Sequence, residues 1–218
     1  MPRRNRVDPW GDLVANPARG LFTGNRGCLV DDHENVVRHH KTNLLWITCL
    51  LEFKGWRVDL ARPNRWTPLF FLDEAVALAA GHRPCGECRR TAYAAYRDAV
   101  SVALGAQKPG SPQKLLTATE LNRRLADERL SPGRGIDRAT DRRTWRAPIA
   151  GLPVWTVVLD DERRPCLWTG EALRPFAFEG WGAPLAVTDE RVEVLTPPTS
   201  VAALAHGFVP VLHPTAFA

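Results

Sequence analysis

Cys85 and Cys88 lie two residues apart in the stretch GHRPCGECRR, residues 81–90, and this pair constrains the fold more than any other feature. Gly86 between them allows a turn in which both sulfurs point inward while backbone N–H groups face them. Thiolates are preferred ligands of zinc, and closed tetrahedral zinc sites usually contain four such groups. A redox dithiol would instead need a strand-to-helix setting, which this segment lacks. The pair therefore predicts a zinc knuckle.

The rest of the composition is typical of a folded protein in a reducing compartment. The chain has 218 residues, of which 44% are hydrophobic and 24% charged, and five are cysteines. An odd number of cysteines without a dense pattern indicates thiols or metal ligands rather than disulfides. No apolar run approaches the roughly twenty residues of a membrane span, and no secretion signal follows the N-terminus. We therefore expect a cytoplasmic protein with no membrane partner.

Hydrophobic periodicity predicts an α+β fold in three parts. Residues 1–104 are expected to form a β-hairpin and helix module around the zinc knuckle, with an early turn at Gly24-Asn25. Residues 105–146 are expected to be a linker followed by a basic helix. Residues 147–218 are expected to form a mostly β unit that packs on the first module.

Four helices are predicted from their periodicity and end signals. Asp73 is suited to cap a helix that Gly81 would end in the left-handed conformation. Further helices are predicted over residues 88–104, 117–130 and 199–207. The zinc knuckle is thereby placed between two helices.

The stretch LFFLDEAVALAAGHRPCGECRR, residues 69–90, resembles the second half of the zinc-binding domain of Ada-type methyl-phosphotriester repair proteins. In that family an apolar strand, a helix ending in Ala-Ala-Gly and an Arg-Pro-Cys-x-x-Cys sequence follow one another. The chain also resembles a bacterial protein family that shares GNRG, EFKG, LFFLDEA, GHRPC-x-ECRR and VLTPP. The Ada resemblance implies a zinc cofactor, a DNA partner and a role in DNA repair or modification.

The ligand set departs from the Ada pattern upstream of the knuckle. Cys49 is available as a third ligand, but the positions that match the family's fourth ligand hold Leu45 and Phe53, which cannot bind zinc. This gap favours a shared zinc scaffold over the family's methyl transfer to cysteine. The predicted metal ligands are Cys49, Cys85, Cys88 and Cys28, and the fourth position stays open among Cys28, His33, His39, His40 and water.

Arginine is concentrated in one segment of a chain with a formal net charge of +5. The planar guanidinium fork suits phosphate recognition, although a solvated basic surface would look the same in sequence. The residues predicted to contact nucleic acid are Arg123, Arg124, Arg142, Arg143 and Arg146. An N-terminal arm with Arg3, Arg4 and Arg6 adds to this charge.

Two functions follow from these observations. The preferred one is a zinc-stabilised nucleic-acid-binding protein, with DNA the expected partner. The alternative is a zinc- or carboxylate-dependent enzyme for hydrolysis or group transfer, with its active site between the two halves. The sequence contains no nucleophile elbow, glycine-rich phosphate loop or H-E-x-x-H motif, so whether the chain is an enzyme stays open. Its substrate and oligomeric state stay open as well.

Overall fold

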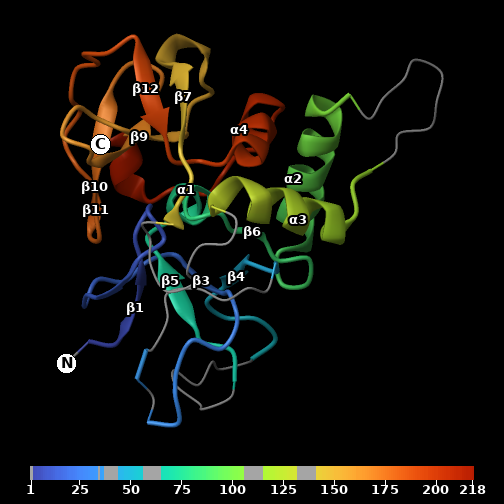
Figure 1. The fold of residues 1–218 in the computed structure, drawn as a ribbon. Helices are drawn as coiled ribbons and strands as arrows, with labels where there is room; N and C mark the ends of the chain where they lie inside the picture. Colours follow the sequence, from blue (N-terminus) through green and yellow to red (C-terminus); the bar gives the residue numbers. More distant parts are fainter. Residues whose placement is uncertain (1, 34, 37–43, 56–64, 106–114, 132–140) are drawn as a thin grey trace.

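Two β-sheets lie one above the other with a short helix between them, as the computed structural model shows in Figure 1. Three further helices cover one side of this stack. The structure describes residues 2–33, 35–36, 44–55, 65–105, 115–131 and 141–218. The predicted α+β class is confirmed, with a mostly antiparallel β unit in the C-terminal part.

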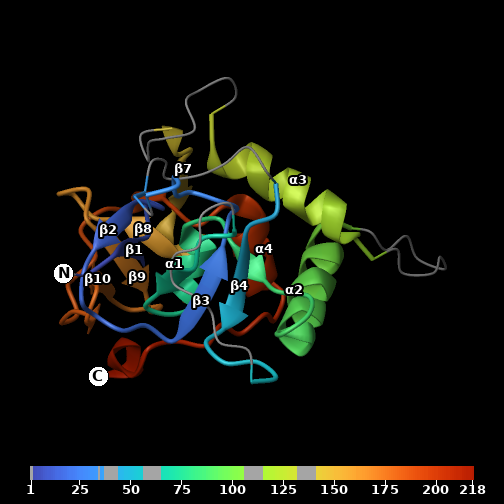
Figure 2. The same ribbon diagram turned by 90° about the horizontal axis from the view of Figure 1, so that it is seen from below.

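The N-terminal sheet is mixed and has the strand order β2-β1-β5-β3-β4-β6. Its strands are β1 (Arg4–Val7), β2 (Leu13–Ala15), β3 (Phe22–Asn25), β4 (Ile47–Leu50), β5 (Leu69–Phe71) and β6 (Arg83–Pro84). The β1–β5 and β4–β6 pairs are parallel and the other pairs antiparallel. Figure 2 shows β3 and β4 side by side in front of the central helix.

The prediction of a turn at Gly24-Asn25 is wrong, because both residues belong to β3. Gly24 pairs with Thr48 on one side and with Leu69 on the other. A Cβ atom at Gly24 would lie 2.3 Å from the carbonyl oxygen of Ile47 and 2.8 Å from the ring of Phe71. Glycine therefore serves close packing here rather than chain reversal.

The C-terminal sheet is antiparallel and has the strand order β11-β10-β9-β8-β12-β7. Its strands are β7 (Trp145–Pro148), β8 (Val157–Leu159), β9 (Pro165–Trp168), β10 (Leu173–Ala177), β11 (Gly180–Trp181) and β12 (Arg191–Val194). Strand β7 begins within the segment 105–146, so the end of that segment belongs to the C-terminal sheet. Two 3₁₀ turns, Ile149–Gly151 and Pro214–Phe217, flank strands of this unit.

The four helices end near the residues that the sequence predicts. They are α1 (Glu74–Ala79), α2 (Arg90–Ala103), α3 (Ala118–Arg129) and α4 (Pro198–Ala205). The side chain of Asp73 accepts a hydrogen bond from the N–H of Val76, which caps α1, and Gly81 follows α1 with φ +82°. Thr117 and Glu120 form a reciprocal capping box at the start of α3. No described helix has the length and apolar character that crossing a membrane would require.

Helix α1 joins the two sheets into one core. All six of its residues are buried. One apolar cluster includes Phe22 and Phe71 from the N-terminal sheet together with Val157, Leu167 and Trp181 from the C-terminal sheet. The two expected halves therefore share their main hydrophobic core.

Candidate metal centre

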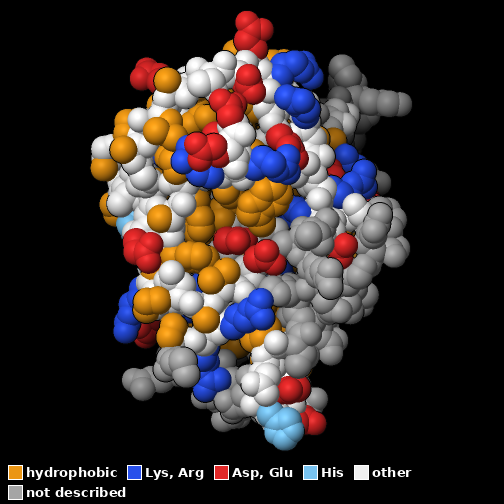
Figure 3. Space-filling view, turned by 60° about the vertical axis from the view of Figure 1, so that its left-hand side comes forward, with side chains coloured by type: hydrophobic (Ala, Val, Ile, Leu, Met, Phe, Trp, Pro, Cys, Tyr) orange, Lys and Arg blue, Asp and Glu red, His pale blue; other side chains and the backbone are white. Residues whose placement is uncertain are grey.

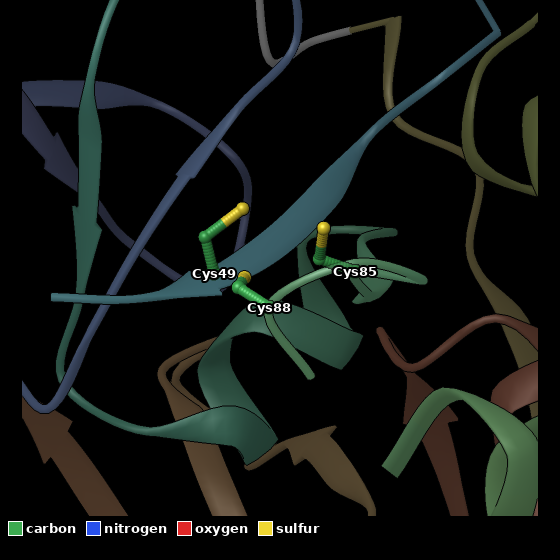
Figure 4. Close-up of side chains that lie close together, drawn as sticks. All are labelled: Cys49, Cys85 and Cys88. Atoms are coloured by element: carbon green, nitrogen blue, oxygen red, sulfur yellow. The ribbon is translucent and has the colours of Figure 1, made fainter. Parts of the chain in front are cut away.

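Three cysteine side chains meet beside strand β4, as Figure 4 shows. Cys49 lies in β4, Cys85 directly follows β6, and Cys88 lies in the turn before α2. Their Sγ atoms all lie within 4.8 Å of one another. Tetrahedral zinc with bonds of about 2.3 Å would need sulfurs about 3.8 Å apart, so the spacing fits a metal ion of this size. Sulfur ligands alone also favour a soft ion over magnesium or calcium.

Backbone hydrogen bonds hold the three thiols in place. The N–H of Cys85 donates to the carbonyl oxygen of Thr48 over 3.0 Å, which fixes the knuckle against the residue before Cys49. The N–H of Glu87 donates to the Cys85 sulfur over 3.4 Å, and the nearby backbone of Leu50 favours the thiolate form of Cys88. Donors aimed at sulfur stabilise its thiolate form, which is the form that binds metal.

The thiols also perturb one another strongly. Interaction with the nearby Cys49 thiol, together with the knuckle N–H groups, lowers the pKa of Cys85 to about 5. The same interaction raises the pKa of Cys49, and burial adds to the effect. Burial first, and then the charge of Cys85, raises the pKa of Cys88. Three thiolates this close repel one another, so a divalent cation is the natural compensating charge.

Two of the arginines beside the knuckle have different roles. Arg83 feels the thiol charges of Cys85 and Cys49, and its guanidinium donates to Asn122 of α3 over 2.8 Å. Arg89 instead forms a buried ion pair with Glu74 of α1. Only Arg83 of these two therefore contributes electrostatically to the thiol cluster.

The predicted fourth ligands do not join the cluster within the described residues. Cys28 lies outside it, because the chain after β3 directs its thiol toward the carbonyl oxygen of Val30 at 3.7 Å. His33 is exposed in a turn in which Asp31 accepts hydrogen bonds from backbone N–H groups. His39 and His40 lie outside the described residues. The described part of the chain thus supplies three sulfur ligands.

The arginines predicted to contact nucleic acid separate into exposed and internal residues. Arg123, Arg124, Arg143 and Arg146 are exposed. Arg142, by contrast, donates to the carbonyl oxygens of Arg129 at 3.0 Å and Leu195 at 2.8 Å, and also to that of Ala79. A guanidinium held by three carbonyls is less available to an external phosphate than the four exposed ones, and the role of Arg142 stays a prediction. On the face shown in Figure 3, basic side chains are interspersed with acidic and apolar ones.

A groove of about 680 Å³ lies on the N-terminal sheet. Arg3, Arg6 and Arg19 line it together with Phe70, and none of its described lining residues is acidic. The guanidinium carbon of Arg6 lies 4.6 Å from the centre of the Phe70 ring. The charge of Arg19 and burial both lower the pKa of Arg6, with burial the larger cause. The groove is therefore cationic with an aromatic wall.

The groove and the thiol cluster share one face of the sheet. Arg6 pairs with Phe70, Phe70 with Thr23, and Thr23 with Cys49, so these residues form one row across four strands. Residues directly opposite each other on neighbouring strands project to the same face. Two strand spacings, about 10 Å, separate Phe70 from Cys49. Leu51, two residues after Cys49, also lines the groove.

This groove was not predicted from the sequence. Arg6 belongs to the basic N-terminal arm, whereas Arg19 and Phe70 had no assigned role. The available signal was the position of Phe70 between Leu69 and Phe71, since alternate residues of a strand face opposite sides. Leu69 and Phe71 are buried in the core, whereas Phe70 is only partly buried.

Comparisons with known proteins give no match: no family model, no curated protein and no solved structure is matched by this chain. The resemblance to Ada-type zinc-binding domains therefore stays a prediction.

Proposed function

We propose that the chain is a zinc-stabilised nucleic-acid-binding protein. The observation that carries the proposal is the arginine groove, whose described lining includes no acidic residue and which lies on the same sheet face as the three thiols. Zinc would be held by Cys49, Cys85 and Cys88, and would fix β4, β6 and the start of α2 against one another. A rigid sheet would then present Arg3, Arg19 and Phe70 to the ligand.

The chemistry of the groove suits a polymer of phosphates and bases. Arginine forks bind phosphate oxygens and release counterions from the polymer. An aromatic ring such as Phe70 offers a stacking surface that accepts any base, which favours single-stranded over duplex nucleic acid at this groove. The exposed Arg123 and Arg124 of α3 provide a second basic surface, away from the aromatic wall.

The enzyme alternative finds less support between the two halves. The carboxylate of Asp73 accepts hydrogen bonds from Trp181 Nε1 at 2.7 Å, from the N–H of Val76 at 3.0 Å and from the N–H of His213 at 3.1 Å. Glu74 pairs with Arg89 and accepts a hydrogen bond from a backbone N–H. Carboxylates engaged in this way support the core rather than proton transfer.

Fluorescence anisotropy with labelled oligonucleotides tests the proposal and locates the interface. The Arg3→Ala/Arg19→Ala double variant should weaken binding of a single-stranded oligonucleotide about tenfold or more at low salt. The wild-type affinity should fall steeply with added salt. Phe70→Leu should weaken single-stranded binding and leave the smaller duplex affinity nearly unchanged.

The matched control is the Arg123→Ala/Arg124→Ala double variant, which removes the same charge from α3. If this variant loses the affinity and the groove variant keeps it, the nucleic-acid interface lies on α3 and the groove assignment fails. If the wild-type protein binds neither single-stranded nor duplex DNA nor RNA at low salt, the proposed function itself fails.

A further inference from the structure

Three contacts fix the side chain of Arg6 in the wall of the groove. Its Nε donates to the carbonyl oxygen of Ala18 over 2.6 Å, and its Nη1 donates to Oδ1 of Asn5 over 2.8 Å. Its guanidinium carbon lies over the Phe70 ring, 4.6 Å from the ring centre. Two hydrogen bonds and one ring contact thus hold the guanidinium in one place.

The partners of Arg6 are themselves held by the fold. Asn5 belongs to β1 and has an exposed fraction of 4%. The N–H of Ala18 donates to Oδ1 of Asn16 over 2.7 Å, which fixes the segment that carries the Ala18 carbonyl. Phe70 belongs to β5 and is paired with Arg6 in the sheet. A guanidinium held by such partners loses little conformational freedom when a ligand binds.

The guanidinium of Arg6 is accessible from the groove. Arg6 is one of the lining residues and is only partly buried. Its Nη2 has no hydrogen-bond acceptor within the described part of the chain, since the contacts above use Nε and Nη1. The charge of the exposed Arg19 acts on Arg6, so a second guanidinium lies nearby. The groove therefore presents a planar cation that is backed by an aromatic ring.

A nucleic-acid base can stack on a guanidinium plane as it does on an aromatic ring. The ring of Phe70 and the guanidinium of Arg6 already form the first two layers of such a stack. A base laid against Arg6 would be the third layer, and the cation would attract the π-systems on both of its sides. Lysine cannot replace arginine in this role, because its ammonium group is a point charge without a plane.

We propose that Arg6 is the base-stacking residue of the groove, with one unpaired base lying against its guanidinium and Phe70 on the other side. Arg3 and Arg19 would then bind the phosphates that flank this base. The groove volume of about 680 Å³ lies within the range of about 300–1,000 Å³ that is usual for sites holding one small ligand. The assignment, which rests on the proposed nucleic-acid function, makes the ligand of the groove one unpaired nucleotide with its neighbouring phosphates.

Two other roles for Arg6 would give different results. If Arg6 only holds the segment that contains Ala18 in place, replacing it should weaken the binding of every polyanion alike. If the base stacks directly on Phe70, replacing Arg6 by another cation should leave the recognition of bases intact. A comparison of strands with and without bases separates these roles from stacking on Arg6.

Fluorescence anisotropy with two labelled single strands provides this comparison. One strand is an oligothymidylate, and the other has the same length and the same phosphates but abasic sugars. The wild-type protein should bind the base-bearing strand about tenfold more tightly than the abasic strand, as expected for the stacking of one base. Arg6→Lys keeps the charge, so its affinity for the abasic strand should stay within about twofold of wild type while the ratio of the two affinities falls to about one.

Arg19→Lys is the matched control, because it makes the same change at a position assigned to phosphate, and it should leave the ratio unchanged. Phe70→Leu should lower the ratio only in part, since the leucine side chain still lies beneath Arg6. A wild-type ratio in Arg6→Lys, or equal weakening on both strands, would overturn the assignment. If Arg6→Lys does not fold, a ratio of one in Phe70→Leu assigns the stacking to Phe70 and likewise overturns it.

The wild-type protein alone distinguishes failure of this assignment from failure of the proposed function. Equal affinity for the base-bearing and abasic strands would show that the groove binds phosphates without stacking a base, so the role of Arg6 fails while nucleic-acid binding stands. Binding to neither strand, nor to duplex DNA or RNA, at low salt would mean that the proposed function itself fails.

Discussion

Cys85 is held by hydrogen bonds at both its backbone N–H and its sulfur, and so it fixes the thiol cluster more than Cys49 or Cys88 does. Its N–H anchors the knuckle to β4, and its sulfur accepts a hydrogen bond from the N–H of Glu87 and lies beside the Cys49 thiol. Replacing this sulfur removes a metal ligand and the acceptor of that hydrogen bond. The loss should therefore reach beyond the metal to the packing of β4 against β6.

Cys85→Ser should lower the metal content from about one zinc per chain to a small fraction of that, and should destabilise the fold by at least about 2 kcal/mol. Elemental analysis and urea unfolding measure the two effects. Cys28→Ser is the matched control. Because Cys28 lies outside the cluster, this variant protein should keep its metal. Equal metal loss in both variants would restore Cys28 as a ligand.

Asp8 makes stability depend on pH. Burial raises its pKa from 3.8 to about 7, despite hydrogen bonds from backbone N–H groups and the nearby charge of Arg26. A carboxyl group with a raised folded-state pKa binds its proton more tightly in the folded protein than in the unfolded chain. Its contribution to stability is thus complete below about pH 4 and is lost as the pH rises toward about 7.

Asp8→Asn should flatten the decline in stability between pH 5 and 7, a difference of about 2 kcal/mol from wild type. Urea unfolding of both proteins across this range measures it, and the comparison cancels acid-induced loss of metal. Asp189→Asn, at an exposed position, should follow the wild-type curve. The idea is wrong if the Asp8→Asn and wild-type curves run parallel.

At the scale of elements, local signals predict the helices well and the strand pairing poorly. Asp73 and Thr117 mark helix starts through side-chain capping, and Gly81 marks a helix end through its backbone conformation, and both signals depend only on neighbouring residues. The parallel β1–β5 pair joins segments far apart in sequence. No local pattern specifies such a pair, and so the groove that it creates around Arg6 and Phe70 was missed.

The metal centre likewise has a part that is predictable from local sequence and a part that depends on strand pairing. The Cys85–Cys88 pair is predictable because its ligand spacing is local. Cys49 was included as an upstream thiol within reach, whereas Cys28, also upstream, lies outside the cluster. The difference arises from strand pairing: β4 lies beside β6, so Cys49 reaches the knuckle, while the segment after β3 carries Cys28 elsewhere.

Two features favour glycine at position 81, which follows α1: its backbone conformation and the lack of space for a side chain. Substitution should be unfavourable for both reasons. Its φ is +82°, and a Cβ atom would lie 2.8 Å from Cδ of the buried Arg129 side chain. Gly207 follows α4 with φ +94°, but its Cβ would meet nothing within 4 Å. Gly207→Ala should therefore cost about 1 kcal/mol through the backbone alone.

Gly81→Ala should cost about 2–4 kcal/mol, because the clash with Arg129 adds to the backbone strain. Urea unfolding of both variants gives the comparison. Equal costs at the two glycines would show instead that the Arg129 side chain moves aside freely.

At the scale of the whole molecule, the main hydrophobic core is shared by both sheets, although the C-terminal unit also has a smaller cluster of its own. Trp181 of β11 donates from Nε1 to the carboxylate of Asp73 over 2.7 Å, so a residue of the C-terminal sheet supports the cap of α1. The N–H of His213 donates to the same carboxylate. The periodicity of the sequence indicates which face of an element is apolar. It does not indicate that α1 would be buried by both sheets.

This shared core predicts that the metal centre and the C-terminal sheet unfold together. Trp181→Phe removes one donor from a buried carboxylate and should destabilise the protein by about 2–4 kcal/mol. The control Trp168→Phe removes a hydrogen bond to the neutral carbonyl oxygen of Leu152 and should cost less.

In urea, the release of zinc to a colorimetric chelator and the loss of far-ultraviolet circular dichroism should share one midpoint. Trp181→Phe should lower both midpoints equally, although the thiol cluster lies on the other sheet. An unchanged midpoint for zinc release in Trp181→Phe would show instead that the two sheets unfold independently.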